Sequence, residues 1–433
     1  MAVKFISVLG KGPYKECMYR YEDFQQKDEY IQKTLIDYFA YKKINIDKFI
    51  ILLTEEARKA RWEQELKPLL QASRDKILEK DIPLGANEEE IWQLFQCIFD
   101  SLDDGDEVYF DITHSLRSLP MLILIVLNYS KVAKNIKIKG IYYGAYEVRK
   151  ILEGEEVAQI FDLMPYEQLL SWAQAVDGYI NSGNADRLRD LSKDILLPKI
   201  KNKNIQAVEI RSFVDSLGIF TETINTCRGM YIEGFKNKSK KSVMISAEAM
   251  RNKLDRLLQG NNNELKPLSP LFHLIEKDTE EFKNDNNLFT GLAVVRWSIK
   301  NNLIQQAFTA LEETLKTYVC LRYGLSDTDR EHREVIVSRA INLSIKKGEI
   351  KYEDLPESHR DMIIRITKEL KEDFIAICDN TKQFRNDINH FGFREDAKDS
   401  NRFKQEVTKL FERFLTFIES HPIEISSDKE GLF

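Results

Sequence analysis

The chain has 433 residues, of which 43% are hydrophobic and 31% are charged, and its formal net charge is -6 at pH 7. This length is too great for one ordinary hydrophobic core and suits two or three domains. The composition excludes a disordered, collagen-like or low-complexity protein. The negative net charge excludes a globally basic nucleic-acid binder, so any contact with nucleic acid must be a local patch.

The sequence also carries no sign of a membrane protein or of an oxidised, secreted one. No apolar run approaches the roughly 18 residues of a membrane span, and the first residues lack the charged-then-apolar layout of a signal peptide. The five cysteines form no C-x-x-C pair, and their odd number argues against a disulfide framework. We therefore expect a cytoplasmic protein with reduced cysteines and no membrane association.

The first part of the chain, up to about Pro165, alternates short apolar runs with helical stretches. The apolar runs are mostly continuous, which is typical of strands that are covered on both faces of a parallel sheet. Strands are expected at Val3–Leu9, Lys48–Leu53, Glu107–Ile112 and Lys137–Tyr143. Helices are expected at Glu29–Tyr41, Glu55–Leu70, Glu88–Leu102 and Pro120–Ala133. Repeated strand–helix–strand units of this kind predict an open α/β sheet with right-handed crossovers.

Beyond Asp162 the strand signal almost vanishes, and apolar residues recur at spacings of three and four. This period predicts an all-α second part. The expected helices are Gln168–Ile180, Ala185–Asp194, Ala207–Leu217, Met244–Leu258, Gly291–Tyr323, Glu331–Lys346, Arg360–Ile377 and Asn401–Glu419. The basic run Lys236–Lys241 is expected to be a solvated loop rather than an RNA contact.

Two of the expected strand ends carry residues that suit an anionic ligand. Gly10, Lys11 and Gly12 follow the first strand, where glycines let a backbone approach a ligand and a lysine can meet a phosphate. A tight strand exit with a solvated lysine is the alternative for this turn. Because ligands of open α/β sheets bind beyond the carboxyl ends of the strands, a phosphate-binding loop is one expectation here.

The second such segment is Asp111–Pro120 (DITHSLRSLP), between a buried strand and the start of a helix. Its threonine and serine can cap the helix, and free N–H groups at a helix start suit a phosphate. Arg117 adds a bidentate phosphate partner, and His114 adds a hydrogen-bond donor or a stacking ring. For Asp111 and Thr113 a purely structural role, with a buried and satisfied carboxylate, is equally attractive.

At this segment the chain resembles the CRISPR-associated Rossmann fold (CARF) proteins, whose signature is D-[IV]-T-H-[GS]-[FL]-R-S-[LI]-P. The stretch FISVLGKGPYKECMYRY resembles the first strand and loop of the same family. The resemblance implies a Rossmann-like CARF domain over residues 1–165. It also implies binding of cyclic oligoadenylate, the messenger of type III CRISPR systems, in a pocket shared across a dimer axis; we expect a ring of four adenylates. By matching position, the pocket would be lined by Gly10, Lys11, Gly12, Thr113, His114, Ser115 and Arg117.

A second group of polar residues, Phe384–Gly392 (FRNDINHFG), lies near the C-terminus and contains the spacing R-x4-H. Arginine and histidine without a carboxylate cluster suit RNA cleavage without a metal ion. In that reaction the 2′-hydroxyl attacks the adjacent phosphorus, His390 transfers a proton and Arg385 stabilises the charge on the phosphoryl oxygens. Five residues at about 100° each put the two side chains about 140° apart on a helix. One helix therefore aims both at one phosphate only if it ends near Gly392 or if a second copy completes the site. The alternative is an exposed helix end that His390 caps.

This pair is similar to the R-x4-H motif of the HEPN (higher eukaryotes and prokaryotes nucleotide-binding) ribonucleases, whose sites form at a dimer interface. The resemblance implies a HEPN domain over residues 291–433, joined to the CARF domain by a helical connecting region over 166–290. Asn386 resembles the polar residue that often follows the family's arginine and is expected to assist positioning. The helix Asn301–Tyr323 resembles the first HEPN helix, whose acidic or polar face approaches the site. Glu312 or Glu313 could serve there, although we expect them to be surface residues.

The sequence thus predicts a homodimeric endoribonuclease that is activated by cyclic oligoadenylate and cleaves single-stranded RNA without a metal. No metal cofactor is expected, since the remaining histidines lack zinc-ligand spacing. The acidic turn at Asp103–Asp106 also lacks the glutamate that a calcium loop needs at its twelfth position, which His114 occupies. Two alternatives remain: a non-catalytic CARF regulator, and a ring nuclease that degrades the messenger in the CARF pocket.

Overall fold

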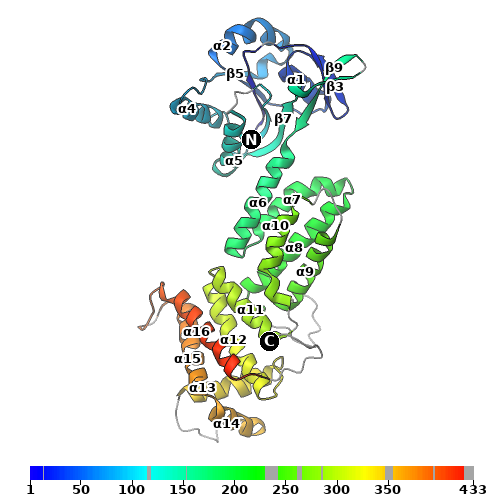
Figure 1. The fold of residues 1–433 in the computed structure, drawn as a ribbon. Helices are drawn as coiled ribbons and strands as arrows, with labels where there is room; N and C mark the ends of the chain where they lie inside the picture. The colour runs from blue at the N-terminus through cyan, green and yellow to red at the C-terminus, as the bar shows by residue number, and fades with distance from the viewer. Residues whose placement is uncertain are drawn as a thin grey trace. The chain divides into compact units, whose positions relative to one another are not determined.

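The computed structural model describes residues 1–12, 14–114, 119–152, 154–229, 242–260, 266–283, 286–346, 355–393 and 395–423. The chain divides into two compact units, Met1–Gln168 and Leu169–Phe433 (Figure 1). Within the described ranges, no helix combines the length and the apolar character that a bilayer crossing requires.

The described strands of the first unit form one nine-stranded sheet in the order β3-β2-β9-β7-β6-β1-β4-β5, with β8 paired to β9. The strands are β1 Val3–Leu9, β2 Cys17–Tyr21, β3 Phe24–Asp28, β4 Lys48–Leu53, β5 Ile77–Asp81, β6 Glu107–Asp111, β7 Lys137–Gly144, β8 Lys150–Leu152 and β9 Glu155–Asp162. Every neighbouring pair in the stretch β5-β4-β1-β6-β7 is parallel. The four strands expected from their apolar runs are therefore confirmed, and so is the parallel sheet that they predict.

The other strands make the sheet mixed rather than purely parallel. The β2–β3 hairpin is antiparallel, and β9 runs antiparallel to both β7 and β8. These strands and β5 were not predicted; all of them except β9 have five residues or fewer. Strand β3, for example, reads FQQKD and has no buried residue.

Helices cover both faces of this sheet, as the α/β prediction requires. They are α1 Ile31–Tyr41, α2 Glu55–Ala57, the π-helical η1 Arg58–Leu66, α3 Lys67–Leu69, α4 Glu88–Phe99 and α5 Leu119–Ala133, with short 3₁₀ turns η2 Gln71–Lys76 and η3 Tyr146–Val148. Successive strand side chains point to opposite faces. Phe5 packs into the core formed with α1 and η1, whereas its neighbour Ile6 packs into the core formed with α4 and α5.

The described elements of the second unit are helical, as predicted, and α6 begins in the first unit. The α-helices are α6 Met164–Ser182, α7 Asp186–Lys201, α8 Ile205–Asn225, α9 Val243–Gln259, α10 Ser269–Asp278, α11 Asn287–Lys300, α12 Ile304–Arg322, α13 Ser338–Lys346, α14 Arg360–Glu369, α15 Glu372–Asn389 and α16 Arg402–Ser420. Shorter turns are η4 Glu280–Lys283, the π-helical η5 Glu331–Val337 and η7 Glu357–His359.

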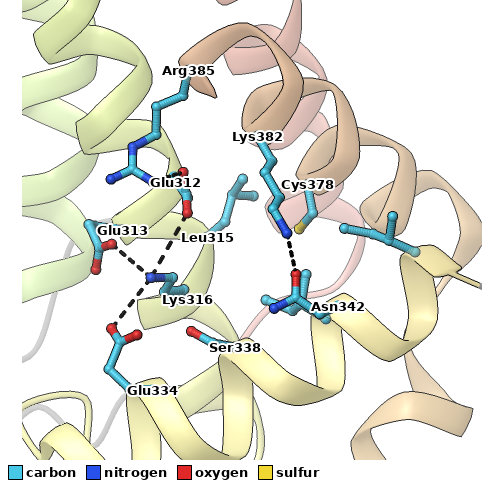
Figure 2. A pocket seen from close by; sticks show the side chains of 12 residues that line it. Glu312, Glu313, Leu315, Lys316, Glu334, Ser338, Asn342, Cys378, Lys382 and Arg385 are labelled. Carbon is cyan, nitrogen blue, oxygen red and sulfur yellow. Dashed lines mark hydrogen bonds and ion pairs between the residues drawn. The ribbon is translucent and has the colours of Figure 1, made fainter. Parts of the chain in front are cut away.

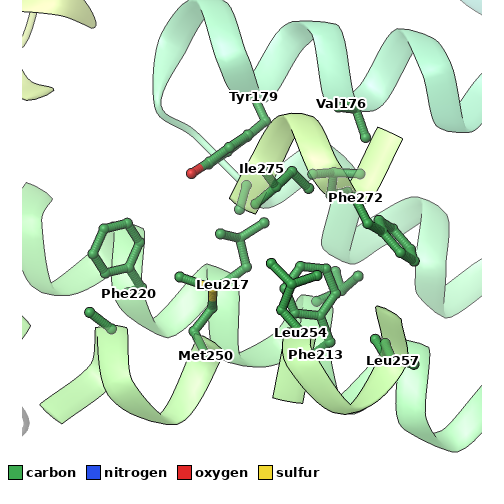
Figure 3. Packing of buried hydrophobic residues seen from close by; sticks show 14 of the residues in the cluster. Val176, Tyr179, Phe213, Leu217, Phe220, Met250, Leu254, Leu257, Phe272 and Ile275 are labelled. Carbon is green, nitrogen blue, oxygen red and sulfur yellow. The ribbon is translucent and has the colours of Figure 1, made fainter. Parts of the chain in front are cut away.

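Two hydrophobic clusters hold these helices together. One is built by α6 to α11 and η4, and Figure 3 shows its packed side chains, among them Phe213, Phe272 and Met250. The other is built by α11 to α16 with η5. Helix α11 contributes to both clusters, with Trp297 in the first and Val295 in the second.

Four predicted helices are wrong in their extent. Those expected at Ala185–Asp194 and Ala207–Leu217 are too short, because α7 continues to Lys201 and α8 to Asn225. The expected helix Gly291–Tyr323 is two helices, because the chain breaks at Asn301–Leu303 and Asn302 adopts a positive φ of 59°. The expected helix Arg360–Ile377 ends at Glu369, and a new helix, α15, begins two residues beyond Leu370. Arg385 therefore lies within α15 rather than after a long helix.

Candidate functional site

The loops that follow β1 and β6 meet at the switch point of the sheet. From β1 the chain forms the β2–β3 hairpin at one edge of the sheet and then returns to β4, which pairs with β1. It continues outward to β5 and crosses back to β6, which pairs with β1 on its other side. A side chain at Gly10 would place its Cβ 3.3 Å from the carbonyl oxygen of His114. The two loops are thus in direct contact at the position where open α/β sheets bind ligands.

Tyr14 joins these two loops, a role that the sequence analysis did not assign. Its hydroxyl accepts a hydrogen bond from the Gly10 N–H at 2.9 Å and lies 3.1 Å from the Gly10 carbonyl oxygen. Its ring meets the His114 ring edge to face, with the centroids 4.4 Å apart. Burial raises the pKa of Tyr14, so the phenol stays protonated.

Asp111 and Thr113 form the buried base of the site. Asp111 is fully buried and accepts hydrogen bonds from the Ser7 hydroxyl at 2.6 Å, the Thr113 hydroxyl at 2.6 Å and the Thr113 N–H at 3.0 Å. Burial raises the pKa of this carboxyl group, although those three donors oppose the shift. The Thr113 hydroxyl also accepts the Gly144 N–H at 2.8 Å, so it ties β6 to β7.

His114 has a ring nitrogen that is not used in a hydrogen bond among the described residues. This nitrogen is Nε2, which is buried. Burial lowers the pKa of His114 to about 4, so the ring is neutral at pH 7 and can offer a donor, an acceptor or a stacking face, but no charge. Ser115 and Arg117, which the family resemblance assigns to the pocket, lie outside the described residues.

Lys11 and Gly12 are more open. The Lys11 ammonium pairs with Glu56 at 2.7 Å, and both side chains are at least half exposed, so this ion pair is weak and easily exchanged for another anion. Among the described residues, a Cβ at Gly12 would meet no atom within 4 Å, so none of them requires a glycine there.

Arg385 lies at a separate cavity in the second unit. This cavity of about 370 Å³ lies between α12, η5, α13 and α15 (Figure 2). It is lined by Glu312, Glu313, Leu315, Lys316, Glu334, Ser338, Ile341, Asn342, Ile345, Cys378, Lys382 and Arg385. Arg385 Nη1 lies 2.9 Å from Glu312 Oε2, while Arg385 Nε has no hydrogen-bond partner among the described residues.

The acidic residues of α12 belong to this cavity. Lys316 lies 2.8 Å from Glu313, 3.5 Å from Glu334 and 4.0 Å from Glu312, and Figure 2 shows its ammonium group between them. Although burial raises the pKa of Glu313, Lys316 and Arg333 hold that pKa below its ordinary value. Glu312 and Glu313 therefore line a cavity rather than a flat surface, with side chains 18% and 35% exposed, because η5, α13 and α15 pack around this face of α12.

His390 lies at the end of α15 and is exposed. It is the C-cap residue, and its N–H donates to the carbonyl oxygen of Asn386 at 2.9 Å. His390 is not among the residues that line the cavity. The structure therefore brings Arg385 to Glu312 but leaves His390 on the surface, and the capping role that the sequence analysis weighed is present.

Comparison with known proteins agrees with this fold. Residues 4–147 match the family model described as the CRISPR system endoribonuclease Csx1, CARF domain. The first unit therefore carries a CARF domain, with a Rossmann-like sheet and its loops at the switch point. The chain is also 24% identical over 288 residues to the CRISPR-associated protein MJ1674 of Methanocaldococcus jannaschii, an alignment that covers 65% of this chain. It spans about 40% of the length of that relative. The chain is thus similar to CRISPR-associated accessory proteins that contain a CARF domain.

Within the described residues, no group of three or more histidine, cysteine, aspartate or glutamate side chains is arranged to hold a metal ion. Glu312, Glu313 and Glu334 line one cavity, but Lys316 lies among them. Their arrangement is that of an ion-pair network.

Proposed function

We propose that this chain is an endoribonuclease of type III CRISPR defence, activated by cyclic oligoadenylate and cleaving single-stranded RNA without a metal ion. The observation that carries the proposal is the contact between the β1 and β6 loops at the switch point of a sheet that matches a CARF domain. Gly10 and His114 would contact the messenger there, with Lys11, Gly12, Ser115 and Arg117 as further ligands by family resemblance.

The chemistry would come from Arg385 and His390. A guanidinium group stabilises developing charge on phosphoryl oxygens, and an exposed imidazole can donate or accept a proton. Asn386 would assist positioning by family resemblance, and its main-chain carbonyl oxygen accepts the His390 N–H at the end of α15. Glu312 would orient the guanidinium group through its ion pair.

We further propose that the protein acts as a homodimer. Helix α5 exposes Met121, Ile125, Tyr129 and Val132, which recur at spacings of four, four and three and so form one apolar stripe. The stripe begins in the first turn of α5, seven residues after His114 in the sequence. A second copy that covers this stripe would bring two candidate messenger loops together, as a pocket shared across a two-fold axis requires.

The test is cleavage of a fluorescent single-stranded RNA in EDTA, with and without cyclic tetra-adenylate or cyclic hexa-adenylate. We expect cleavage only with one of the two rings. Arg385→Ala and His390→Ala are each expected to lose at least about a hundredfold in kcat, the scale of a lost proton-transfer or charge-stabilising group. Arg365→Ala and His273→Ala are the matched controls, because both side chains are exposed on helices of the same unit.

Other outcomes separate the remaining candidates. Saturable messenger binding with no RNA cleavage under any condition would overturn the nuclease and leave a non-catalytic regulator. Mass spectrometry of the ring after long incubation tests whether the CARF pocket also degrades it. Full activity of Arg385→Ala or of His390→Ala would remove that residue from the active site.

A further inference from the structure

The turn that follows His390 exposes two phenyl rings. Phe391 and Phe393 are 88% and 87% exposed, more than any other large hydrophobic residue in the described part of the chain. Their ring centroids lie 6.4 Å apart with 26° between the planes, so the two rings are nearly parallel. The hydrophobic effect favours burial of phenylalanine side chains, so two neighbouring rings that are almost fully exposed indicate a role other than packing within this chain.

The turn is ordered by its own hydrogen bonds. The N–H groups of Phe391, Gly392 and Phe393 donate to the carbonyl oxygens of Ile388, Asp387 and His390, at 3.0, 3.1 and 3.0 Å. The side chain of Asp387, which is buried, accepts the N–H of Lys398 at 2.8 Å and so ties the returning chain to the turn. The rings are therefore presented by a fixed backbone.

The backbone also carries strain at this point. Phe391 has a φ of 55° and Gly392 a φ of 71°. Glycine adopts the left-handed region freely, but a bulky residue such as phenylalanine does so rarely. Strain of this kind that coincides with exposed side chains is typical of binding and active sites.

We infer that Phe391 and Phe393 form a base-stacking surface for unpaired nucleotides beside the scissile phosphate. The inference rests on the proposed function and deepens it. Flat aromatic faces bind bases of any sequence, and they need bases that are not already stacked in a duplex. Because the rings follow His390 directly, a base stacked on them would keep the neighbouring ribose and phosphate near the imidazole.

The flank of the turn carries charges of both signs. Arg394 follows the two rings in the sequence, Glu395 and Asp399 are exposed, and the Lys398 ammonium lies 5.1 Å from the centre of the Phe384 ring. Because the rings would bind bases rather than phosphate groups, their contribution should depend little on salt, in contrast to contacts with phosphate groups.

The experiment combines two ring variants with two RNA substrates, in the full chain with cyclic oligoadenylate. Phe391→Leu/Phe393→Leu keeps apolar bulk but removes the aromatic faces, and Phe391→Tyr/Phe393→Tyr keeps them. The RNA carries one ribose in an otherwise 2′-deoxy strand, so that it has one cleavable bond. That bond is flanked either by normal bases or by abasic residues.

With the normal substrate, the Leu variant should lose about tenfold or more in kcat/KM, on the scale of base–aromatic stacking, and the Tyr variant should retain activity. With the abasic substrate, the wild type should lose a similar factor and the Leu variant should lose little more, because the two changes remove the same contact. Since both rings are exposed, all variants should unfold at the wild-type temperature.

Wild-type activity of the Leu variant, or an abasic penalty that persists in it, would overturn the inference while leaving the nuclease intact. A Leu variant that becomes monomeric in size-exclusion chromatography, where the wild type is a dimer, would also overturn it and assign the rings to a protein contact. If the wild type cleaves neither this RNA nor unmodified RNA, the proposed function itself fails.

Discussion

Replacing Thr113 by valine would separate a structural role of its hydroxyl from a ligand-binding one. Valine has nearly the same shape, but it cannot donate to Asp111 at 2.6 Å or accept the Gly144 N–H at 2.8 Å. The Gly144 N–H would lose its partner, and Asp111 would keep only the hydrogen bonds from the Ser7 hydroxyl and the Thr113 N–H. Each loss costs about 1–3 kcal/mol, so the first unit should lose about 2–6 kcal/mol of its free energy of unfolding. For a domain of this size that corresponds to a fall of about 5–20 °C in its Tm.

Differential scanning calorimetry of the full chain measures this change, with Thr113→Ser as the control that keeps the hydroxyl. Ligand binding at temperatures below the transition should survive in Thr113→Val, because the hydroxyl has both of its bonds inside the protein. A Thr113→Val variant that melts at the wild-type temperature but no longer binds cyclic oligoadenylate would refute this reasoning. The hydroxyl would then contact the ligand, as the family resemblance implies.

Three further predictions concern charge and assembly. Burial lowers the pKa of His114 to about 4, so the stability that the neutral ring contributes is present above pH 6.5 and is lost as the pH falls towards 4. Chemical unfolding at a series of pH values should show a loss of about 3 kcal/mol in the free energy of unfolding that His114→Gln lacks. An equal loss in that variant would contradict the assignment. Ile125→Glu puts a charge into the exposed stripe of α5 and should convert a dimer to a monomer in sedimentation analysis, whereas a dimer that persists would exclude this surface. Glu312→Gln removes the charged partner of Arg385 and should lower kcat about tenfold with little change in KM. The Tm should also change little, because a partly exposed ion pair adds little stability. An unchanged kcat would show that the ion pair does not position the arginine.

The parallel part of the fold could be predicted because its signal is local. Strand β1 (VKFISVL) and strand β4 (KFIILL) read as continuous apolar runs, and such runs are buried on both faces of a sheet. Only the family resemblance put the two loops in one pocket, since the pairing of β1 with β6 that brings them together has no local signal. The β2–β3 hairpin has no comparable signal, because β3 is polar along its whole length.

The candidate sites were harder to predict where they depend on distant contacts. Nothing in the residues around Glu312 indicates that α15 will bring Arg385 to within 2.9 Å of it, and Tyr14 gains its role only when the β6 loop places His114 against its ring. The break between α11 and α12 had a visible signal in Asn301 and Asn302, since asparagine tolerates the left-handed conformation. Because apolar residues recur at helical spacing on both sides of the break, the segment was interpreted as one continuous helix.

Helix α11 has two apolar sides and therefore restricts where the second unit can be divided. Leu288, Leu292 and Val295 pack with the later helices, while Val294 and Trp297 pack with the earlier ones. Cutting the chain at residue 290 would divide α11 and expose hydrophobic surface on both fragments. We expect both fragments to aggregate when they are made separately, and a fragment that keeps residues 287–300 to remain soluble. Helix α11 is therefore part of both hydrophobic cores rather than a boundary between two domains.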